Sequence, residues 1–129
     1  MSFLVDSDIL IDGLVGRPAA LDLFAQLRHQ GLAVSIVSYG EVFEGAYKAS
    51  DPQERLARFR AYLDDFAVVP LSDPVMETFA RVRADLRRAG QLISDLDLLI
   101  AATATHHELT LITRNLRHFE RIPELKIYR

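Results

Sequence analysis

The sequence predicts an α/β fold in which a mostly parallel central sheet of four to five strands carries helices on both faces. Three observations support this prediction. The chain has 129 residues, which suits a single domain over residues 1–129. Half of the residues are apolar and 26% are charged, a balance typical of globular proteins and not of disordered or fibrous ones. Short apolar runs alternate with longer segments that carry helix signals, and this alternation is typical of βαβ units.

The predicted strands are short runs of apolar and β-branched residues. The first run ends abruptly at Asp6, and the second is rich in Val and Ile, which favour strands. In chain order the five runs are residues 2–5, 32–37, 67–70, 110–113 and 125–128.

The predicted helices begin at residues that commonly cap or start a helix. Ser7, Ser38 and Ser94 each open one helix, while Gly31 and Gly90 end two others. In chain order the helices are residues 9–14, 19–29, 38–48, 52–64, 73–88 and 94–107. Residues 115–120 are expected to form a loop or a single turn.

Composition and charge exclude several classes of protein. The chain has no cysteine, so it holds neither a disulfide nor a cysteine-ligated zinc site. Its formal net charge of −3 excludes a globally basic nucleic-acid-binding surface. We expect no membrane or export segment, because the first apolar run stops at Asp6 and the longest later run, residues 98–104, is far shorter than the roughly 20 residues of a membrane span. These features predict a cytoplasmic protein.

Polar side chains follow several of the predicted strands. Asp6 ends the first strand, Ser38 and Glu41 follow the second, and Thr113 and Asn115 lie at the end of the fourth. Sites in parallel sheets form at the carboxyl ends of the strands. We therefore expect these five side chains to lie at one edge of the sheet.

Carboxylates are concentrated in three short segments, residues 6–8, 38–41 and 94–97. Two carboxylates 4 Å apart repel by about 4 kcal/mol near a protein surface, unless a cation neutralises them or one of them takes a proton. Because these segments offer only oxygen ligands, they favour Mg²⁺ or Mn²⁺ over Zn²⁺. Such ions support the hydrolysis of phosphodiester bonds.

Structural explanations of the same residues remain open. Residues 38–41 match a helix capping box, and residues 94–97 match one more loosely. Asp8 also fits a solvated helix face. Asp95 and Asp97 lie about 200° apart around a helix, so at most one of them points at a bound ion.

Four motifs lie in order over nearly the whole chain, at residues 3–11, 38–45, 97–104 and 109–123. Together they resemble the PIN domain family and most closely its VapC-like toxins of type II toxin–antitoxin systems. The first segment resembles the family's opening LLDTNVLI, and the second its S-x-x-E-x-x-x-G segment. The third resembles its D-x-x-I-A-A-x-A helix, and the fourth its closing L-T-L-v-T-r-N…F…i-p segment.

The resemblance implies a three-layer α/β/α PIN fold and a Mg²⁺- or Mn²⁺-dependent endoribonuclease that a VapB-like antitoxin blocks and that forms a homodimer. Asp6, Glu41 and Asp97 match the family's acidic metal ligands and are the implied catalytic residues. Asn115 stands where many relatives have a fourth Asp, so its neutral oxygen would hold a second ion more weakly. Asp8 replaces the usual Asn and adds negative charge beside the site.

Further residues are expected to support this site. Ser7 and Thr113 would orient the attacking water by hydrogen bonds, while Asp95 lies just before a matching acid. Arg114 and Arg117 flank the closing segment and are the candidates to contact the RNA backbone. Ordinary surface arginines would explain the same two positions.

Apolar side chains in the two predicted helices of residues 38–48 and 52–64 form either a groove for an antitoxin helix or part of the core. These side chains are Phe43, Tyr47, Leu56, Phe59 and Leu63.

Two other functions stand beside the endoribonuclease. One is a catalytically silent PIN module that binds RNA or a protein partner, and the three intact acids argue against it. The other is a phosphatase that uses an aspartyl nucleophile, because residues 6–8 form an acidic D-x-D pattern after an apolar strand, as that chemistry requires. Against the phosphatase, Leu10 stands where that chemistry expects a hydroxyl group.

Overall fold

The computed structural model describes residues 2–129 and centres on a sheet of four short parallel strands. The strands lie in the order β3-β2-β1-β4, and the sheet prediction is confirmed. Leu4 on the central strand β1 pairs with Ala33 of β2 and with Leu111 of β4. The strand bounds are Phe3–Val5 for β1, Leu32–Ser35 for β2, Ala67–Val69 for β3 and Thr110–Ile112 for β4.

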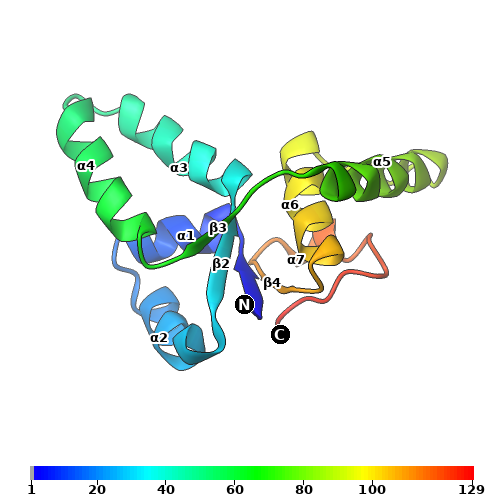
Figure 1. The fold of residues 1–129 in the computed structure, drawn as a ribbon, viewed down its shortest axis with the longest axis horizontal. Coiled ribbons are helices and arrows are strands. Elements are labelled where there is room, and N and C mark those ends of the chain that lie inside the picture. The colour runs from blue at the N-terminus through cyan, green and yellow to red at the C-terminus, as the bar shows by residue number, and fades with distance from the viewer. Residues whose placement is uncertain (1) are drawn as a thin grey trace.

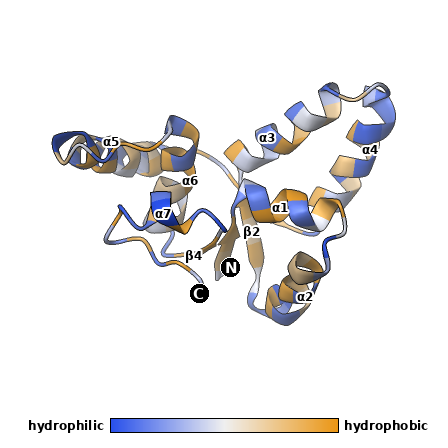
Figure 2. Ribbon diagram, turned by 180° about the vertical axis from the view of Figure 1, so that it is seen from behind, coloured by the Kyte–Doolittle hydropathy of each residue, from blue (hydrophilic) through white to orange (hydrophobic). Residues whose placement is uncertain are grey.

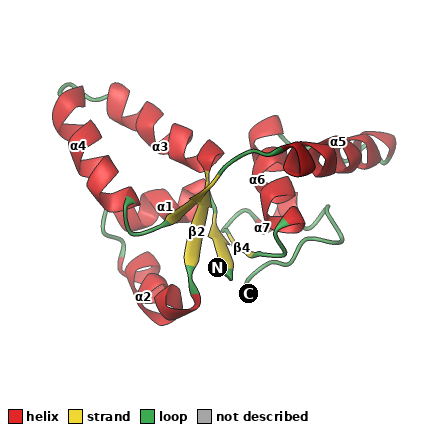
Figure 3. Cartoon of the chain, in the orientation of Figure 1, coloured by secondary structure: helices red, strands yellow, loops and turns green. Residues whose placement is uncertain are grey.

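Helices cover both faces of the sheet, so the predicted three-layer α/β/α architecture is confirmed (Figures 1 and 3). One layer holds α1 (Ser7–Leu14), α2 (Pro18–Leu27), α3 (Ile36–Tyr47) and α4 (Pro52–Leu63), with a 3₁₀ turn at Arg28–Gln30. The other layer holds α5 (Asp73–Arg88), α6 (Asp95–His106) and the one-turn helix α7 (Leu116–Phe119). In residues 2–129 no helix combines the length and the apolar character needed to cross a bilayer.

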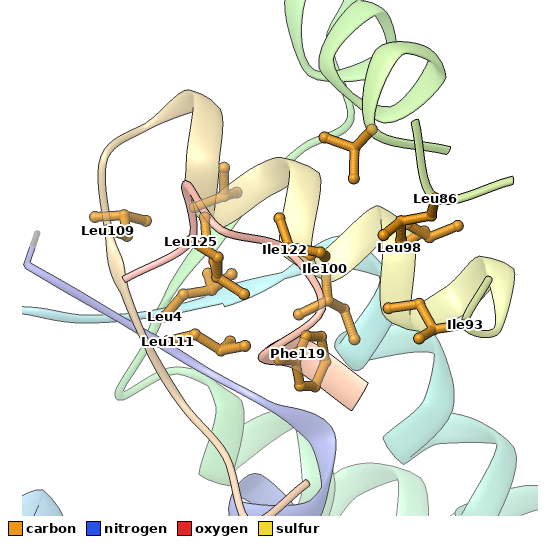
Figure 4. Close-up of a cluster of buried hydrophobic side chains, with 14 of the residues drawn as sticks. Leu4, Leu86, Ile93, Leu98, Ile100, Leu109, Leu111, Phe119, Ile122 and Leu125 are labelled. Atoms are coloured by element: carbon orange, nitrogen blue, oxygen red, sulfur yellow. The ribbon is translucent and has the colours of Figure 1, made fainter. Parts of the chain in front are cut away.

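The alternation of side chains along each strand divides the buried apolar residues into two cores. Leu4 and Leu111 face α5, α6 and α7, where they pack with Ile100 and Phe119 (Figure 4). Val5 faces the opposite layer and packs with side chains of α1 to α4. Figure 2 shows apolar residues along the strands and many hydrophilic residues on α5. Strands β1, β2 and β4 are therefore largely buried on both faces, as their apolar sequences require, whereas Val68 of the edge strand β3 is 38% exposed.

The structure corrects the predicted boundary between the second strand and the helix that follows it. The strand ends at Ser35, and α3 begins at Ile36. Ile36 and Val37 are β-branched, which is why the sequence assigned them to the strand. The Ser35 hydroxyl accepts the Val37 N–H at 3.1 Å and caps the helix two residues early. At the start of the chain, α1 likewise begins at Ser7, with Asp6 as its cap.

The fifth predicted strand, residues 125–128, forms only a single parallel bridge from Ile127 to Leu111. The Leu111 N–H donates to the Lys126 carbonyl, and the Tyr128 N–H donates to the Leu111 carbonyl, both at 2.8 Å. This segment lies beside the edge strand β4 without extending the sheet into a fifth regular strand. Residues 115–120 were expected to form a loop or a single turn. They form a single turn, because α7 occupies residues 116–119.

Gly13 and Gly45 both lie inside helices, but their surroundings predict opposite effects of substitution. A Cβ at Gly13 would overlap the ring of Phe24 and lie 2.6 Å from the Tyr62 hydroxyl, which donates to the Leu10 carbonyl. Gly13→Ala should lower the free energy of unfolding by about 1–3 kcal/mol. A Cβ added at Gly45 would have no atom from another part of the chain within 4 Å. Gly45→Ala should therefore raise the free energy of unfolding by about 0.5–1 kcal/mol. Urea denaturation measures the change in the free energy of unfolding for both variants. A change in the same direction in both would contradict this account.

Candidate functional site

The predicted side chains meet at the carboxyl edge of the sheet, where β1, β2 and β4 end. The Thr113 hydroxyl, which follows β4, donates to Asp6 Oδ2 at 2.7 Å. The Ser7 hydroxyl, which follows β1, donates to Glu41 Oε1 at 2.6 Å. Segments more than a hundred residues apart in sequence therefore contact each other there, and the predicted common edge is confirmed.

Asp6 is the most buried acid of this site, with only 5% of its surface exposed. Its carboxylate accepts the Ser7 N–H at 2.8 Å and the Thr113 hydroxyl at 2.7 Å, and both donors are neutral. Burial, reinforced by the negative charges of Asp8 and Asp97, raises the pKa of Asp6 to about 7 against the lowering effect of these hydrogen bonds. The ionised carboxylate is thus costly until a positive charge comes beside it.

Glu41 is held by a chain of two buried serines. Ser7 Oγ lies 2.6 Å from Glu41 Oε1 and 2.8 Å from Ser38 Oγ. A carboxylate only accepts hydrogen bonds, so the single Ser7 hydroxyl hydrogen goes to Glu41 and the Ser38 hydroxyl donates to Ser7. The predicted capping box at residues 38–41 is therefore wrong, because Ser35 caps α3 and Ser38 lies within the helix.

Asp97 lies in the first turn of α6, and its backbone N–H donates to the Ser94 hydroxyl at 3.2 Å. This half of the looser capping box is confirmed. The Asp97 side chain turns instead towards His118, with Oδ2 3.4 Å from Nδ1. Asp95 points elsewhere and pairs with Arg83 at 2.9 Å, so only one of the two acids faces the site. This separation follows from their angular spacing around the helix.

His118 is a residue of the site that the sequence analysis missed. Its Nδ1 lies 2.8 Å from Asn115 Nδ2, and the Asn115 N–H donates to the Thr113 hydroxyl at 3.0 Å. Hydrogen bonds thus lead from Asp6 through Thr113 to Asn115. His118 Nδ1 lies between Asn115 and Asp97, but this one ring nitrogen either accepts from the Asn115 amide or donates to Asp97, and it does not do both at once. The three-residue spacing from Asn115 to His118, which places both on one side of a helical turn, was the signal that could have found it.

Asp8 and Arg114 interact with each other at the rim of the site. The Arg114 N–H donates to Asp8 Oδ2 at 3.0 Å, and the Arg114 guanidinium lies 3.2 Å from Asp12. Asp8 therefore accepts a hydrogen bond from the backbone of Arg114, and the Arg114 side chain forms an ion pair with Asp12 of the same chain. Arg117 is exposed on α7.

Oxygen donors suited to a hard divalent cation are available at this edge. Asp6, Glu41 and Asp97 offer carboxylates, and Asn115 offers an amide oxygen. As the side chains stand, residues 2–129 hold no group of three His, Cys, Asp or Glu side chains gathered closely enough to bind a metal. The fit of a cation rests on the donor chemistry and on Asp6, a buried acid next to two other acids and bonded only to neutral groups.

The apolar side chains of α3 and α4 divide between the two predicted roles. Leu56, Phe59 and Leu63 are buried in the core. Phe43 and Tyr47 instead line a surface hollow of about 310 Å³, together with Tyr39, Gly40 and Arg60. The Arg60 guanidinium lies 5.7 Å from the centre of the Phe43 ring, so one wall of this groove is cationic and aromatic.

Comparisons with known proteins identify relatives over the full length of the chain. The family model for the PIN domain matches residues 3–125. The chain is 33% identical to "Ribonuclease VapC1" of Methanocaldococcus jannaschii, over 95% of this chain and 88% of that protein. It is 27% identical to "tRNA(fMet)-specific endonuclease VapC" of Shigella flexneri, over 98% and 96%.

The fold has equally close structural neighbours. The crystal structure of DNA-bound VapBC from Salmonella typhimurium contains a chain that matches with a TM-score of 0.92 and 26% identity, over 99% of this chain and 97% of that one. A toxin–antitoxin complex from Klebsiella pneumoniae contains a chain that matches with a TM-score of 0.77 and 31% identity, over 96% and 95%.

Proposed function

The chain belongs to the PIN domain family, and from this premise we propose that it is a metal-dependent endoribonuclease, the toxin of a VapBC-like toxin–antitoxin pair that acts in the cytoplasm. The observation that carries the proposal is the buried Asp6, which lies among acids at the carboxyl edge of the sheet with only neutral hydrogen-bond donors. A protein tolerates such a carboxylate where a bound cation repays its burial. The ribonuclease names of its full-length relatives supply the reaction class.

Asp6, Glu41 and Asp97 are the proposed catalytic metal ligands, and Asn115 is a weaker fourth. When bound there, Mg²⁺ or Mn²⁺ would lower the pKa of water and polarise the scissile phosphate. The side chains of the protein orient the proposed ligands: the Ser7 hydroxyl donates to Glu41, and the Thr113 hydroxyl donates to Asp6. His118 contacts Asp97 and Asn115 and limits their freedom to turn away.

We propose that arginines at the rim of the site contact the phosphates of the RNA backbone. Arg117 is exposed on the short helix that follows Asn115, so its guanidinium can meet a phosphate directly. The Arg114 guanidinium contributes after exchanging its contacts with Asp12 and, at 3.9 Å, Asp8 for a phosphate. Asp8 is in turn occupied by the N–H groups of Ile9 and Arg114, which argues against the phosphatase alternative that would need it as an acid.

The antitoxin is proposed to lay a helix on the groove of α3 and α4 that Phe43 and Tyr47 line. Tyr47 is 65% exposed, and tyrosine is enriched at protein interfaces because its ring packs against a partner while its hydroxyl group finds a polar neighbour. A structure of the toxin–antitoxin complex with the antitoxin helix elsewhere would overturn this placement. Homodimerisation belongs to the same proposal, and sedimentation velocity of the purified chain tests it.

Asp97 and Asp95 provide a matched pair of variants for testing the endoribonuclease. Purified protein should cut total RNA into discrete fragments with Mg²⁺ or Mn²⁺ and should not cut it with a chelator. Asp97→Asn should slow cleavage about 100-fold or more, because it removes a proposed metal ligand. Asp95→Asn should stay within about threefold of the wild type, because Asp95 faces Arg83 and not the site.

The outcomes of this experiment separate the alternatives. If the folded wild type cuts no RNA with either metal, the endoribonuclease proposal fails and the silent PIN module takes its place. If both Asp variants lose activity equally, the assignment of Asp97 as the ligand fails while the ribonuclease stands.

A further inference from the structure

Ser38 is fully buried inside α3, where a hydroxyl group needs a specific reason to be present. A serine in a helix interior is less favourable than alanine, and a buried hydroxyl without a partner costs further free energy. Capping does not explain it, because Ser35 caps this helix. Among the described residues, the hydrogen-bond partner recorded for its hydroxyl is Ser7 Oγ, at 2.8 Å.

The Ser7 hydroxyl connects Ser38 to the candidate site. It lies 2.6 Å from Glu41 Oε1, so the three side chains form one directed chain from Ser38 to Ser7 to Glu41. Ser7 follows β1 and Glu41 lies on α3, and the serine pair is therefore a link between two elements of the fold. With Ser38 donating to its oxygen, the Ser7 hydroxyl hydrogen can point only towards Glu41.

We propose that Ser38 is a positioning residue for the metal site, which acts by fixing the Ser7 hydroxyl and through it the carboxylate of Glu41. This inference rests on the proposed function, because it gives Glu41 the role of a metal ligand. Groups that orient ligands from behind commonly change metal affinity by 10- to 100-fold when they are removed. Ser38 has no direct contact with the cation in this account, and its whole effect passes through Ser7.

The test is a calorimetric titration with Mn²⁺ alone, without RNA, on the full chain and a set of serine variants. Ser38→Ala should weaken Mn²⁺ binding about tenfold, and Ser7→Ala should weaken it at least as much. The double variant should bind Mn²⁺ as Ser7→Ala does, within about twofold, because Ser38 has nothing left to act through. The Mn²⁺ concentration for half-maximal RNA cleavage should shift by the same factors.

Ser35→Ala is the matched control. Ser35 is equally buried and its hydroxyl is equally engaged, but it bonds the Val37 N–H of the helix start. This variant should lower the melting temperature through the lost cap and leave Mn²⁺ affinity unchanged. A general loosening of α3 would lower Mn²⁺ affinity in both variants, whereas the proposed route lowers it only in Ser38→Ala.

Each outcome decides the inference. Wild-type Mn²⁺ affinity in Ser38→Ala, or equal loss in Ser35→Ala, overturns the role of Ser38 while the ribonuclease stands. Additive effects of Ser38→Ala and Ser7→Ala overturn the route through Ser7. A folded wild type that neither binds Mn²⁺ nor cuts RNA overturns the proposed function and this inference with it. Circular dichroism checks folding, and Ser38→Cys, which keeps the size and a weak donor, replaces Ser38→Ala if that variant is unfolded.

Discussion

Asp6→Asn is expected to abolish RNA cleavage and, at the same time, to make the metal-free protein more stable at neutral pH. Cleavage should fall about 100-fold or more, because the variant loses the central proposed metal ligand. The gain in stability follows from burial, which raises the pKa of Asp6 from 3.8 to about 7. Asparagine has no charge to bury and retains an oxygen for the Ser7 N–H.

The direction of this stability change follows from how the stability of the wild type depends on pH. Between pH 4 and 7 the unfolded chain has lost the Asp6 proton while the folded chain still holds it. The unfolded state then binds fewer protons, so the contribution of Asp6 to stability is present below pH 4 and is lost as the pH rises to 7. Three pH units correspond to about 4 kcal/mol as an upper limit. Asp6→Asn should remove this decline.

Urea denaturation in the presence of a chelator, at pH 4.5, 6 and 7.5, measures the effect. Asp12→Asn is the control, because Asp12 pairs with Arg17 and Arg114 and its loss should not stabilise the protein. Saturating Mn²⁺ should stabilise the wild type more than Asp6→Asn. An Asp6→Asn protein no more stable than the wild type at pH 7.5 would show that burial of this carboxylate carries no such cost.

Phe119→Ala is expected to have the largest effect on folding. Phe119 is fully buried and is the largest of the fully buried side chains. It packs in the core between the sheet, α6 and α7, near Leu111 and Ile100 (Figure 4). Truncating a buried phenylalanine costs about 3–5 kcal/mol, which is a large part of the 5–15 kcal/mol that a typical domain has.

This variant also disturbs the site, because Phe119 anchors the short helix that carries His118 and follows Asn115. Urea denaturation should show the loss of stability, and Mn²⁺ titration of the remaining folded protein should show weaker binding. Phe119→Leu should cost only about 1 kcal/mol, and Arg117→Ala, at an exposed position of the same helix, less than about 0.5 kcal/mol. A Phe119→Ala protein within 1 kcal/mol of the wild type would contradict this role.

The sequence predicts the layers of this fold better than its boundaries. Apolar runs and capping residues were sufficient for the parallel sheet and for helices on both faces. They failed at Ile36 and Val37, because β-branched residues favour a strand and only the Ser35 cap starts the helix there. The segment near Ile127 has strand composition, but it contacts β4 through a single bridge.

The candidate site shows the same division. The sequence predicted that Asp6 and Thr113 lie close together, because each follows a strand and parallel strands end at one edge of the sheet. Their hydrogen bond confirms this. The partners of individual side chains depend on contacts between distant segments, which sequence spacing does not contain. Arg114 therefore turned out to bind Asp12 of its own chain, and Ser38 to bond Ser7 and not the helix start.

The pairing of β1 with β4 has a consequence for the synthesis of the protein. Residue 6 meets residue 113 in space, and His118 lies against Asn115 and Asp97 at the same edge of the sheet. A nascent chain on the ribosome cannot assemble these groups until residue 118 has emerged, because the chain leaves the ribosome from its N-terminus. The proposed ribonuclease would therefore have an incomplete site while residues 1–118 are being synthesised.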